Sequence, residues 1–255
     1  MKKLFLLAVS LMLVLSAVAG CGSSEKKADT SKVLRIGTEA TFAPFEFEGE
    51  NGYTGFDMDL IRAIAEKMGR KAEIANLGFD GLIPALNAGN IDVVIAGMTI
   101  TPEREKQVNF SLPYYKSGLK VMVRKDDTNI KGIDDLVGKR IAVQIGTTGA
   151  MAAENVKDAK VTSFNANTEA ALELKNAGVD AVIQDLPVAA YFLKNGGGDA
   201  YAKLVGETLS AENYGIAVKK GNDELTKEIG HAMNELVKSG EYKKIYVKWF
   251  GEEVK

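Results

Sequence analysis

The sequence contains few residues of several kinds on which other protein classes depend. Its 255 residues include one cysteine and one histidine. A single cysteine cannot form an internal disulfide. The histidine, His231, lies in a predicted helix, and no serine or cysteine stands beside it to act as a nucleophile. We therefore predict no catalytic residue.

An excess of charge of one sign is also absent. The chain has 32 Lys and Arg against 34 Asp and Glu, a formal net charge of −2 at pH 7. Its charged runs mix both signs, as solvated helix faces do. No basic patch with interleaved aromatic residues is present, which argues against a nucleic-acid partner. We also assign the sequence no metal and no cofactor.

The one long apolar run lies at the amino terminus. Two lysines precede an apolar stretch over residues 4–18, which is the layout of a bacterial secretory signal and is short for a membrane span. The following Ala19-Gly20-Cys21 resembles the end of a lipobox, in which the cysteine thiol takes a diacylglycerol. We therefore predict a lipoprotein signal peptide over residues 1–20, lipidation of Cys21, a flexible tether over residues 21–31, and an exported protein anchored to the outer face of the cell membrane.

Two segments of the chain echo each other. Residues 87–99 and 176–185 both begin with Asn-Ala-Gly, where a helix is expected to end at the glycine. Both then continue into a predicted buried strand. A second echo precedes each copy, because the apolar runs over residues 33–38 and 140–147 both end in Ile-Gly-Thr. Either echo alone is compatible with chance. Both together, in matching order, predict two similar α/β lobes with a cleft between them.

Strand and helix signals alternate along both halves of the chain. The predicted strands cover residues 33–36, 71–75, 91–96, 140–144, 161–164, 181–183 and 215–218, and the predicted helices cover residues 57–68, 82–87, 150–156, 168–176, 224–239 and 241–249. Asn167 is the expected N-cap of the helix that follows it.

The helical tail is predicted to rejoin the first lobe. The first lobe then comprises residues 32–115 and 212–255, and the second comprises residues 116–211. The chain would cross between the lobes twice and form a two-strand hinge, for which the candidate residues are Tyr114, Gly118 and Tyr214.

Residues suited to binding a free amino acid gather at the predicted strand ends. Ligands sit outside the carboxyl ends of strands in open parallel sheets, and an amino acid needs a forked donor for its carboxylate and acceptors for its ammonium. Arg104 supplies the fork, and the loop at Thr147 precedes a helix, where N–H groups favour an anion. Asp185 can neutralise the ammonium, and Gly97 and Thr99 can accept its remaining protons.

Each of these residues also has a simpler interpretation. Arg104 could pair with a neighbouring glutamate on a helix surface. The glycine before Thr147 could belong to an ordinary turn. Phe42 and Phe79 could be core residues, or they could be the plates that enclose a ligand side chain.

Beyond these residues, the chain resembles a family 3 solute-binding protein, the receptor of an ABC transporter for polar amino acids. The similarity covers Val33 to Glu252 and lies in motifs at residues 37–46, 55–60, 97–104, 110–115, 146–149, 184–185 and 248–251. It implies a two-lobe periplasmic-binding-protein type II fold, with two mixed sheets flanked by helices. It also implies a free L-amino acid as ligand and an ABC permease as partner. We expect a monomer, because nothing in the sequence requires a dimer.

The resemblance also implies roles for individual residues. In similar proteins, the residues at the positions of Arg104 and Thr147, with Thr99, hold the ligand carboxylate. Gly97, Thr99 and Asp185 hold the ammonium, and Phe42 and Phe79 enclose the side chain.

Four further residues are candidates for selecting the ligand side chain: Glu39, Met98, Gln144 and Gln184. Some glutamine receptors carry lysine at the position of Gln144 and histidine at that of Gln184, so the sequence departs from them at both. An uncompensated Glu39 favours a cation. We therefore expect arginine or another basic amino acid, lysine or histidine, with glutamine second and an acidic ligand last.

Two other functions remain open. Periplasmic lyases resembling cyclohexadienyl dehydratase use the same fold, and Glu39 is the one carboxylate at the strand ends that is free to donate a proton. A ligand-sensing domain of a receptor or channel is the other alternative, although no transmembrane segment follows Trp249. The complete amino-acid clamp favours binding over catalysis.

Overall fold

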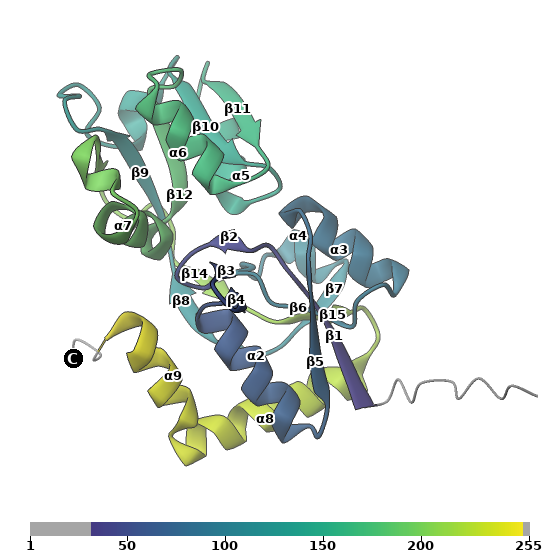
Figure 1. Cartoon of the computed structure of the whole chain (residues 1–255). Helices are drawn as coiled ribbons and strands as arrows, with labels where there is room; N and C mark the ends of the chain where they lie inside the picture. Colours follow the sequence, from purple (N-terminus) through teal and green to yellow (C-terminus); the bar gives the residue numbers. More distant parts are fainter. Residues whose placement is uncertain (1–31, 252–255) are drawn as a thin grey trace, which may run out of the picture. The chain divides into compact units, whose positions relative to one another are not determined.

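The computed structural model describes residues 32–251 of the chain. The predicted signal peptide, the Cys21 lipidation site and the predicted tether all lie outside the described residues. Two five-stranded mixed sheets with flanking helices form the framework, which confirms the predicted fold class. Figure 1 shows them as separate layers of strands.

The first sheet has the strand order β5-β1-β6-β15-β7. Its strands are β1 (Val33–Thr38), β5 (Lys71–Asn76), β6 (Val93–Val94), β7 (Val108–Phe110) and β15 (Ala217–Lys219). Strands β1, β5 and β6 run parallel, whereas β15 pairs antiparallel with both β6 and β7. The sheet is thus completed by a strand from near the end of the chain.

Alternation along β6 gives this sheet two apolar faces. Val93 packs in a cluster with Leu60 and Ile64 of α2, while its neighbour Val94 packs in another cluster with Leu82 of α3. Successive side chains of a strand point to opposite faces, so a continuous run of valines serves both. The helices joined to this sheet are α2 (Phe56–Lys67), α3 (Phe79–Ala88), α4 (Pro102–Glu105), α8 (Asp223–Ser239) and α9 (Glu241–Phe250).

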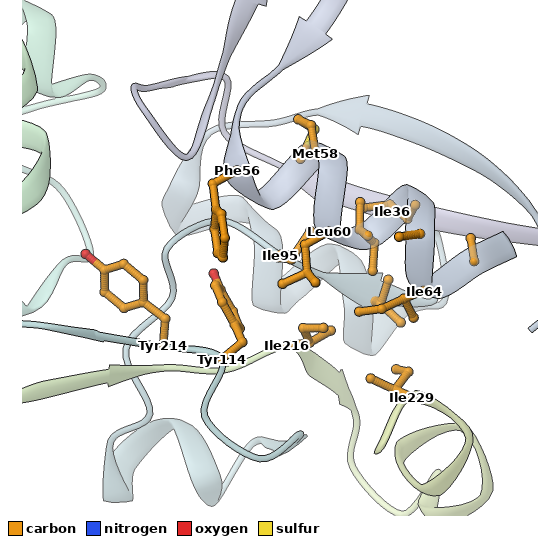
Figure 2. Close-up of a cluster of buried hydrophobic side chains, with 14 of the residues drawn as sticks. Ile36, Phe56, Met58, Leu60, Ile64, Ile95, Tyr114, Tyr214, Ile216 and Ile229 are labelled. Atoms are coloured by element: carbon orange, nitrogen blue, oxygen red, sulfur yellow. The ribbon is translucent and has the colours of Figure 1, made fainter. Parts of the chain in front are cut away.

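Helices α2, α8 and α9 contact one another (Figure 1). Figure 2 shows part of the cluster that they cover, with Leu60 and Ile64 of α2 beside Ile36 and Ile95 of the sheet. Leu60 and Ile64 lie four residues apart, which places them on one face of α2, and all four side chains are fully buried. Their burial stabilises the first lobe by roughly 1.5–3 kcal/mol for each large aliphatic side chain.

The second sheet has the order β11-β10-β12-β9-β13. Its strands are β9 (Leu119–Arg124), β10 (Arg140–Gln144), β11 (Lys160–Phe164), β12 (Ala181–Asp185) and β13 (Ala202–Val205), and its helices are η2 (Ile133–Leu136), α5 (Thr148–Glu154), α6 (Asn167–Lys175), α7 (Leu186–Asn195) and η3 (Gly198–Ala200). Strands β10, β11 and β12 are parallel, as in the first sheet. Ile141 packs in one cluster with Ala150 of α5, and Ala142 packs in another with Ala170 of α6.

Two small sheets complete the fold. Strands β2 (Thr41–Phe42), β3 (Glu46–Gly49) and β4 (Gly52–Thr54) form an antiparallel meander. Strand β8 (Tyr115–Ser117) pairs antiparallel with β14 (Glu212–Tyr214), and this pair makes the two-strand hinge. Within residues 32–251, no helix combines the length and apolarity needed to span a bilayer.

The predicted elements differ from the structure at several boundaries. The predicted N-cap at Asn167 is wrong, because Ala166 is the N-cap and Asn167 is the first helical residue. Helix α3 begins at Phe79, three residues before the predicted start, and β6 is shorter than the predicted strand. Strands β9 and β13 and helix α7 were not predicted.

Candidate functional site

The carboxyl ends of β6, β10 and β12 lead to one small cavity of about 10 Å³. The residues that line it come from both sheets, and most of them are predicted binding residues: Phe42, Phe79, Gly97, Thr99, Arg104, Gln144, Thr147, Thr148 and Asp185. The structure therefore brings together residues that were predicted from the rule that ligands sit outside the carboxyl ends of strands in open parallel sheets.

Arg104 is buried at this cavity and does not form the alternative surface ion pair. Thr101 caps the single turn of α4 by accepting a hydrogen bond from the Arg104 N–H, with Pro102 at the first helical position. The guanidinium donates to the Thr99 carbonyl at 2.7 Å and to the Gly146 carbonyl of the second sheet's loop at 3.0 Å. It lies 5.3 Å from the centre of the Phe79 ring. A guanidinium has five N–H donors, so these two bonds leave others for a ligand carboxylate.

The loop after β10 contributes Thr147 and Thr148. Thr147 is the N-cap of α5, with its hydroxyl oxygen accepting from the Ala150 N–H and its hydroxyl donating to the Gln144 carbonyl. Gly146 adopts a φ of 76°, and a Cβ there would lie 3.3 Å from Asp80. The positive φ favours glycine at this position.

Asp185, the last residue of β12, is a buried carboxylate that faces the same cavity. Its Oδ1 accepts hydrogen bonds from the Tyr214 hydroxyl at 2.5 Å and the Ser117 hydroxyl at 3.3 Å. Burial, followed by the negative charge of Glu212, raises the pKa of Asp185 from 3.8 to about 7. Both donors lie on the hinge strands, so Asp185 joins the site to the hinge.

Gly97 lies at the end of β6 with a φ of 52°. A Cβ at this position would come within 2.5 Å of the Phe42 ring, so the close approach requires glycine. The Gly97 N–H donates to Asp57 Oδ2 at 2.9 Å, behind the cavity. That bond fixes the direction of the peptide group here.

Glu212 is a buried acidic residue near the site that we did not predict. It lies on β14 of the hinge, and its Oε2 accepts from Thr99 at 2.9 Å and from Thr148 at 3.1 Å. These two threonines follow strands of different sheets, so one carboxylate links both. Its place two residues before the predicted hinge residue Tyr214 was the only sequence signal.

The predicted side-chain residues separate into two groups. Gln144 lines the cavity, where it donates to the Asn165 carbonyl and accepts from the Asn167 side chain, both at 2.9 Å. Glu39 is buried beside it and accepts from the Thr41 hydroxyl at 2.6 Å. Burial raises the pKa of Glu39 above 4.5, although hydrogen bonds from Thr41 and Gln144 oppose the shift. Glu39 itself does not line the cavity.

The structure does not bring Met98 or Gln184 to this cavity. Met98 is buried in a hydrophobic cluster with Leu82, on the α3 face of the first sheet. Gln184 lines a second cavity of about 310 Å³, together with Asn167. Because the Asn167 amide donates to Gln144, these two side chains stand between the two cavities.

The predicted hinge residues lie on or beside the two crossing strands. Tyr214 is the last residue of β14, and Tyr114 directly precedes β8. A Cβ on Gly118 would lie 2.3 Å from the Ser210 carbonyl, so the two crossings approach closely at this glycine. Residues 32–251 contain no cluster of histidine, cysteine or acidic side chains that could hold a metal ion.

The family described as bacterial extracellular solute-binding proteins, family 3, matches residues 34–252. The ABC transporter arginine-binding protein 1 of Escherichia coli (strain K12) is 36% identical over 98% of this chain and 99% of its own length.

Solved structures are similar over most of the chain. An ancestral arginine-binding protein bound to arginine is 51% identical, with a TM-score of 0.82, over 86% of this chain and 99% of its own. A structure described as an ancestral arginine-binding protein bound to glutamine is 52% identical, with a TM-score of 0.81, over 87% of this chain and 99% of its own. An ancestral amino-acid-binding protein, described as a precursor of cyclohexadienyl dehydratase, is 42% identical with a TM-score of 0.79, over 86% and 96%.

Proposed function

The chain belongs to the bacterial extracellular solute-binding proteins, family 3, and on that premise we propose that it binds a free polar amino acid between its two sheets and delivers it to an ABC permease. One observation carries this proposal. A buried arginine and a buried aspartate face one cavity that residues of both sheets line. Opposite charges a short distance apart match the carboxylate and ammonium of an amino acid.

In this proposal, Arg104 holds the ligand carboxylate together with Thr99 and Thr147. Without ligand, these two hydroxyls donate to Glu212 and to the Gln144 carbonyl, so each would turn toward the carboxylate when the ligand binds. The guanidinium is already fixed by two carbonyls, so little conformational entropy is lost when it binds. Asp185 holds the ammonium with the Gly97 carbonyl and the Thr99 oxygen. Asp185 is held in turn by Tyr214 and Ser117.

We propose arginine or another basic amino acid as the ligand, with glutamine as the second candidate. Phe42 and Phe79 would enclose the aliphatic part of its side chain. The pairing of Glu39 with Gln144 provides acceptor oxygens for a guanidinium or ammonium beyond them. Close relatives and neighbours described as arginine-binding support this choice.

We also propose that the protein is a receptor and not an enzyme, and that it is a monomer. A lipid on Cys21 would anchor it to the membrane. A periplasmic lyase of the cyclohexadienyl dehydratase type is the alternative, favoured by the similarity to a precursor of that enzyme. Prephenate and arogenate would be its test substrates. Conversion of either one by the purified protein would contradict the receptor proposal.

The decisive experiment is a thermal-shift screen of ligand-stripped protein against all proteinogenic amino acids, followed by calorimetry. We expect the largest shift with arginine or another basic amino acid. Glu39→Gln should weaken arginine binding on the order of 10- to 100-fold, because a hydrogen bond to a charged group contributes ~1.5–3 kcal/mol. Glutamine binding should change little.

Glu48→Gln is the matched control, because Glu48 is an exposed glutamate of β3 nearby in the chain. If glutamine gives the largest shift and Glu39→Gln has no effect, the cationic assignment is wrong. If no amino acid shifts the melting temperature, the receptor proposal itself fails.

A further inference from the structure

Two acidic side chains lie fully buried behind the candidate site without a role in ligand contact. Glu46 is the first residue of β3, and Asp57 is the second residue of α2. Both residues have 0% exposed surface. Two ionised carboxylates in such surroundings would be costly, because burial in a low dielectric penalises each charge and like charges repel.

Hydrogen bonding accounts for only part of this pair. Asp57 Oδ2 accepts from the Gly97 N–H at 2.9 Å and from the Tyr114 hydroxyl at 2.7 Å. Both carboxyl oxygens of Glu46 and the Oδ1 of Asp57 have no hydrogen-bond donor within residues 32–251. Buried polar atoms in native proteins are nearly always paired, so three such oxygens together need an explanation.

A proton explains two of these three oxygens. A side-chain hydrogen bond between Glu46 and Asp57 raises the pKa of Glu46 and lowers that of Asp57. Two carboxylates cannot bond, since neither has a donor, but one proton between them makes an O–H···O⁻ bond and satisfies one oxygen of each group. Such charge-assisted bonds are stronger than bonds between neutral groups.

We propose that Glu46 and Asp57 share a single proton and act as a positioning pair that holds the Gly97 peptide of the ligand site to Tyr114 at the hinge. The pair would contact no ligand. Its importance for binding rests on the proposed function, in which the Gly97 carbonyl accepts from the ligand ammonium.

The position of the pair supports this role. The N–H that Asp57 holds belongs to Gly97, a glycine with a φ of 52° at the ligand site. The hydroxyl that Asp57 holds belongs to Tyr114, the residue before hinge strand β8. Figure 2 shows this hydroxyl directed toward the start of α2, where Phe56 lies. One carboxylate thus joins the end of β6 to the hinge.

The charged surroundings favour retention of the proton. The groups that act most strongly on Glu46 beyond burial are acidic, namely Asp57, Glu39 and Asp185. Burial and these charges raise the pKa of Glu46 well above 4.5, and burial raises the pKa of Asp57 to about 6. Tyr114, on the other side of the pair, remains protonated because burial and Asp57 raise its pKa.

The proton can be observed directly in ligand-free protein. Carbon NMR of protein labelled at its glutamate carboxyl carbons should show one carboxyl that stays protonated at pH 7. Glu46→Gln should remove that signal, and the exposed control Glu48→Gln should keep it. If every labelled glutamate carboxyl of the unmodified protein titrates near its ordinary pKa, the shared proton is excluded, and no variant is needed for that result.

Unfolding equilibria provide a second readout. Glu46 holds its proton in the folded state above the pH at which the unfolded chain releases it, so its stabilising contribution is complete below pH 4.5 and is lost as pH rises. As pH rises from 4.5 toward the raised pKa of Glu46 in the folded protein, the unfolding constant of the unmodified protein should rise, relative to that of Glu46→Gln, by close to tenfold per pH unit for one proton. A constant ratio would overturn the proposal.

Binding of L-arginine tests the positioning role. Glu46→Leu removes the donor and should weaken arginine binding about tenfold, because Asp57 is left with an unpaired oxygen. Glu46→Gln restores a donor and should bind within about twofold of the unmodified protein. Equal affinities for all three would show that the pair does not position Gly97. The NMR result is independent of any ligand, so failure of the proposed function would not be mistaken for failure of the pair.

Discussion

At the scale of single residues, charge is concentrated where water is excluded. Arg104, Asp185 and Glu212 are each less than a tenth exposed. They influence one another, since both acids act on the pKa of Arg104, which burial lowers. The two acids outnumber the one base, so this cluster favours a ligand that brings an ammonium with its carboxylate.

The pKa of Asp185 predicts opposite effects of pH on affinity and on stability. An ammonium ligand needs the carboxylate form, so the affinity for arginine should fall as pH decreases below about 7, approaching tenfold per pH unit. The folded pKa of about 7 lies above the ordinary 3.8, so Asp185 contributes stability that is complete below 3.8 and is lost as pH rises through 7. Calorimetry and urea unfolding from pH 5 to 8 would measure both.

Asp185→Asn should bind arginine weakly with little dependence on pH. The exposed Asp199→Asn is the control and should retain the full profile. An affinity that is constant from pH 5 to 8 in the unmodified protein would contradict the role given to Asp185.

Residue roles were predictable from the sequence where they coincide with strand ends. Arg104 follows the first copy of the repeated segment and Asp185 ends the second, so their convergence could be inferred before any coordinates. Glu212 could not be found in this way, because its partners depend on how the hinge strands pair. Met98 was misplaced, because the direction in which a side chain leaves the chain after a strand end is not fixed by sequence spacing.

At the scale of elements, the apolar pattern predicted the parallel strands and the helices that cover them. Strand β10 and helices α2 and α8 lie within one residue of their expected bounds. Strand β9 was missed because its residues directly follow the hinge and read as part of the crossing. Its place between β12 and β13 depends on long-range antiparallel pairing, which local propensity does not encode.

The crossing strand β14 provides a test at this scale. Glu212→Gln replaces a carboxylate that accepts from Thr99 and Thr148 with a neutral amide. We expect the free energy of unfolding to fall by roughly 1–3 kcal/mol, because the hydroxyls of Thr99 and Thr148 would lose the charged acceptor of their hydrogen bonds. Arginine should also bind less tightly, since one negative charge near the ammonium is removed.

Glu207→Gln, an exposed glutamate before the same strand, is the matched control. Urea unfolding and calorimetry of the two variants should differ clearly. If they behave alike, Glu212 does not link the two sheets energetically.

At the scale of the whole molecule, the site exists only where the two sheets meet. The guanidinium of Arg104 donates to Gly146 of the other sheet's loop, and the cavity is lined both by Thr99, which follows β6 of the first sheet, and by Gln144, which ends β10 of the second. A ligand held by groups on both sheets stabilises the arrangement that brings them together. Strands β8 and β14, paired antiparallel, lie where the chain crosses between the sheets.

Amide hydrogen exchange should reveal this shared dependence on ligand. Saturating arginine should slow exchange in the segment after β6 and also at the start of α5, because a ligand stabilises the form that binds it, by about 2.7 kcal/mol at 100 times the dissociation constant. The amides of α8, remote from the cavity, are the internal control and should change less. Slower exchange on one sheet alone would contradict a ligand held by both.

The late position of β15 in the chain has a consequence for the order of folding. All strands of the second sheet come from one continuous segment, residues 119–205, whereas β15 lies between β6 and β7 of the first sheet. During synthesis, the second sheet can therefore assemble while β6 and β7 still lack the neighbour that joins them. The first sheet must wait for residues 217–219, a contact of high sequence separation that slows folding. A nascent chain of this protein thus stays half-folded until almost all of it has been made, which leaves time for a chaperone or an export machine to engage it.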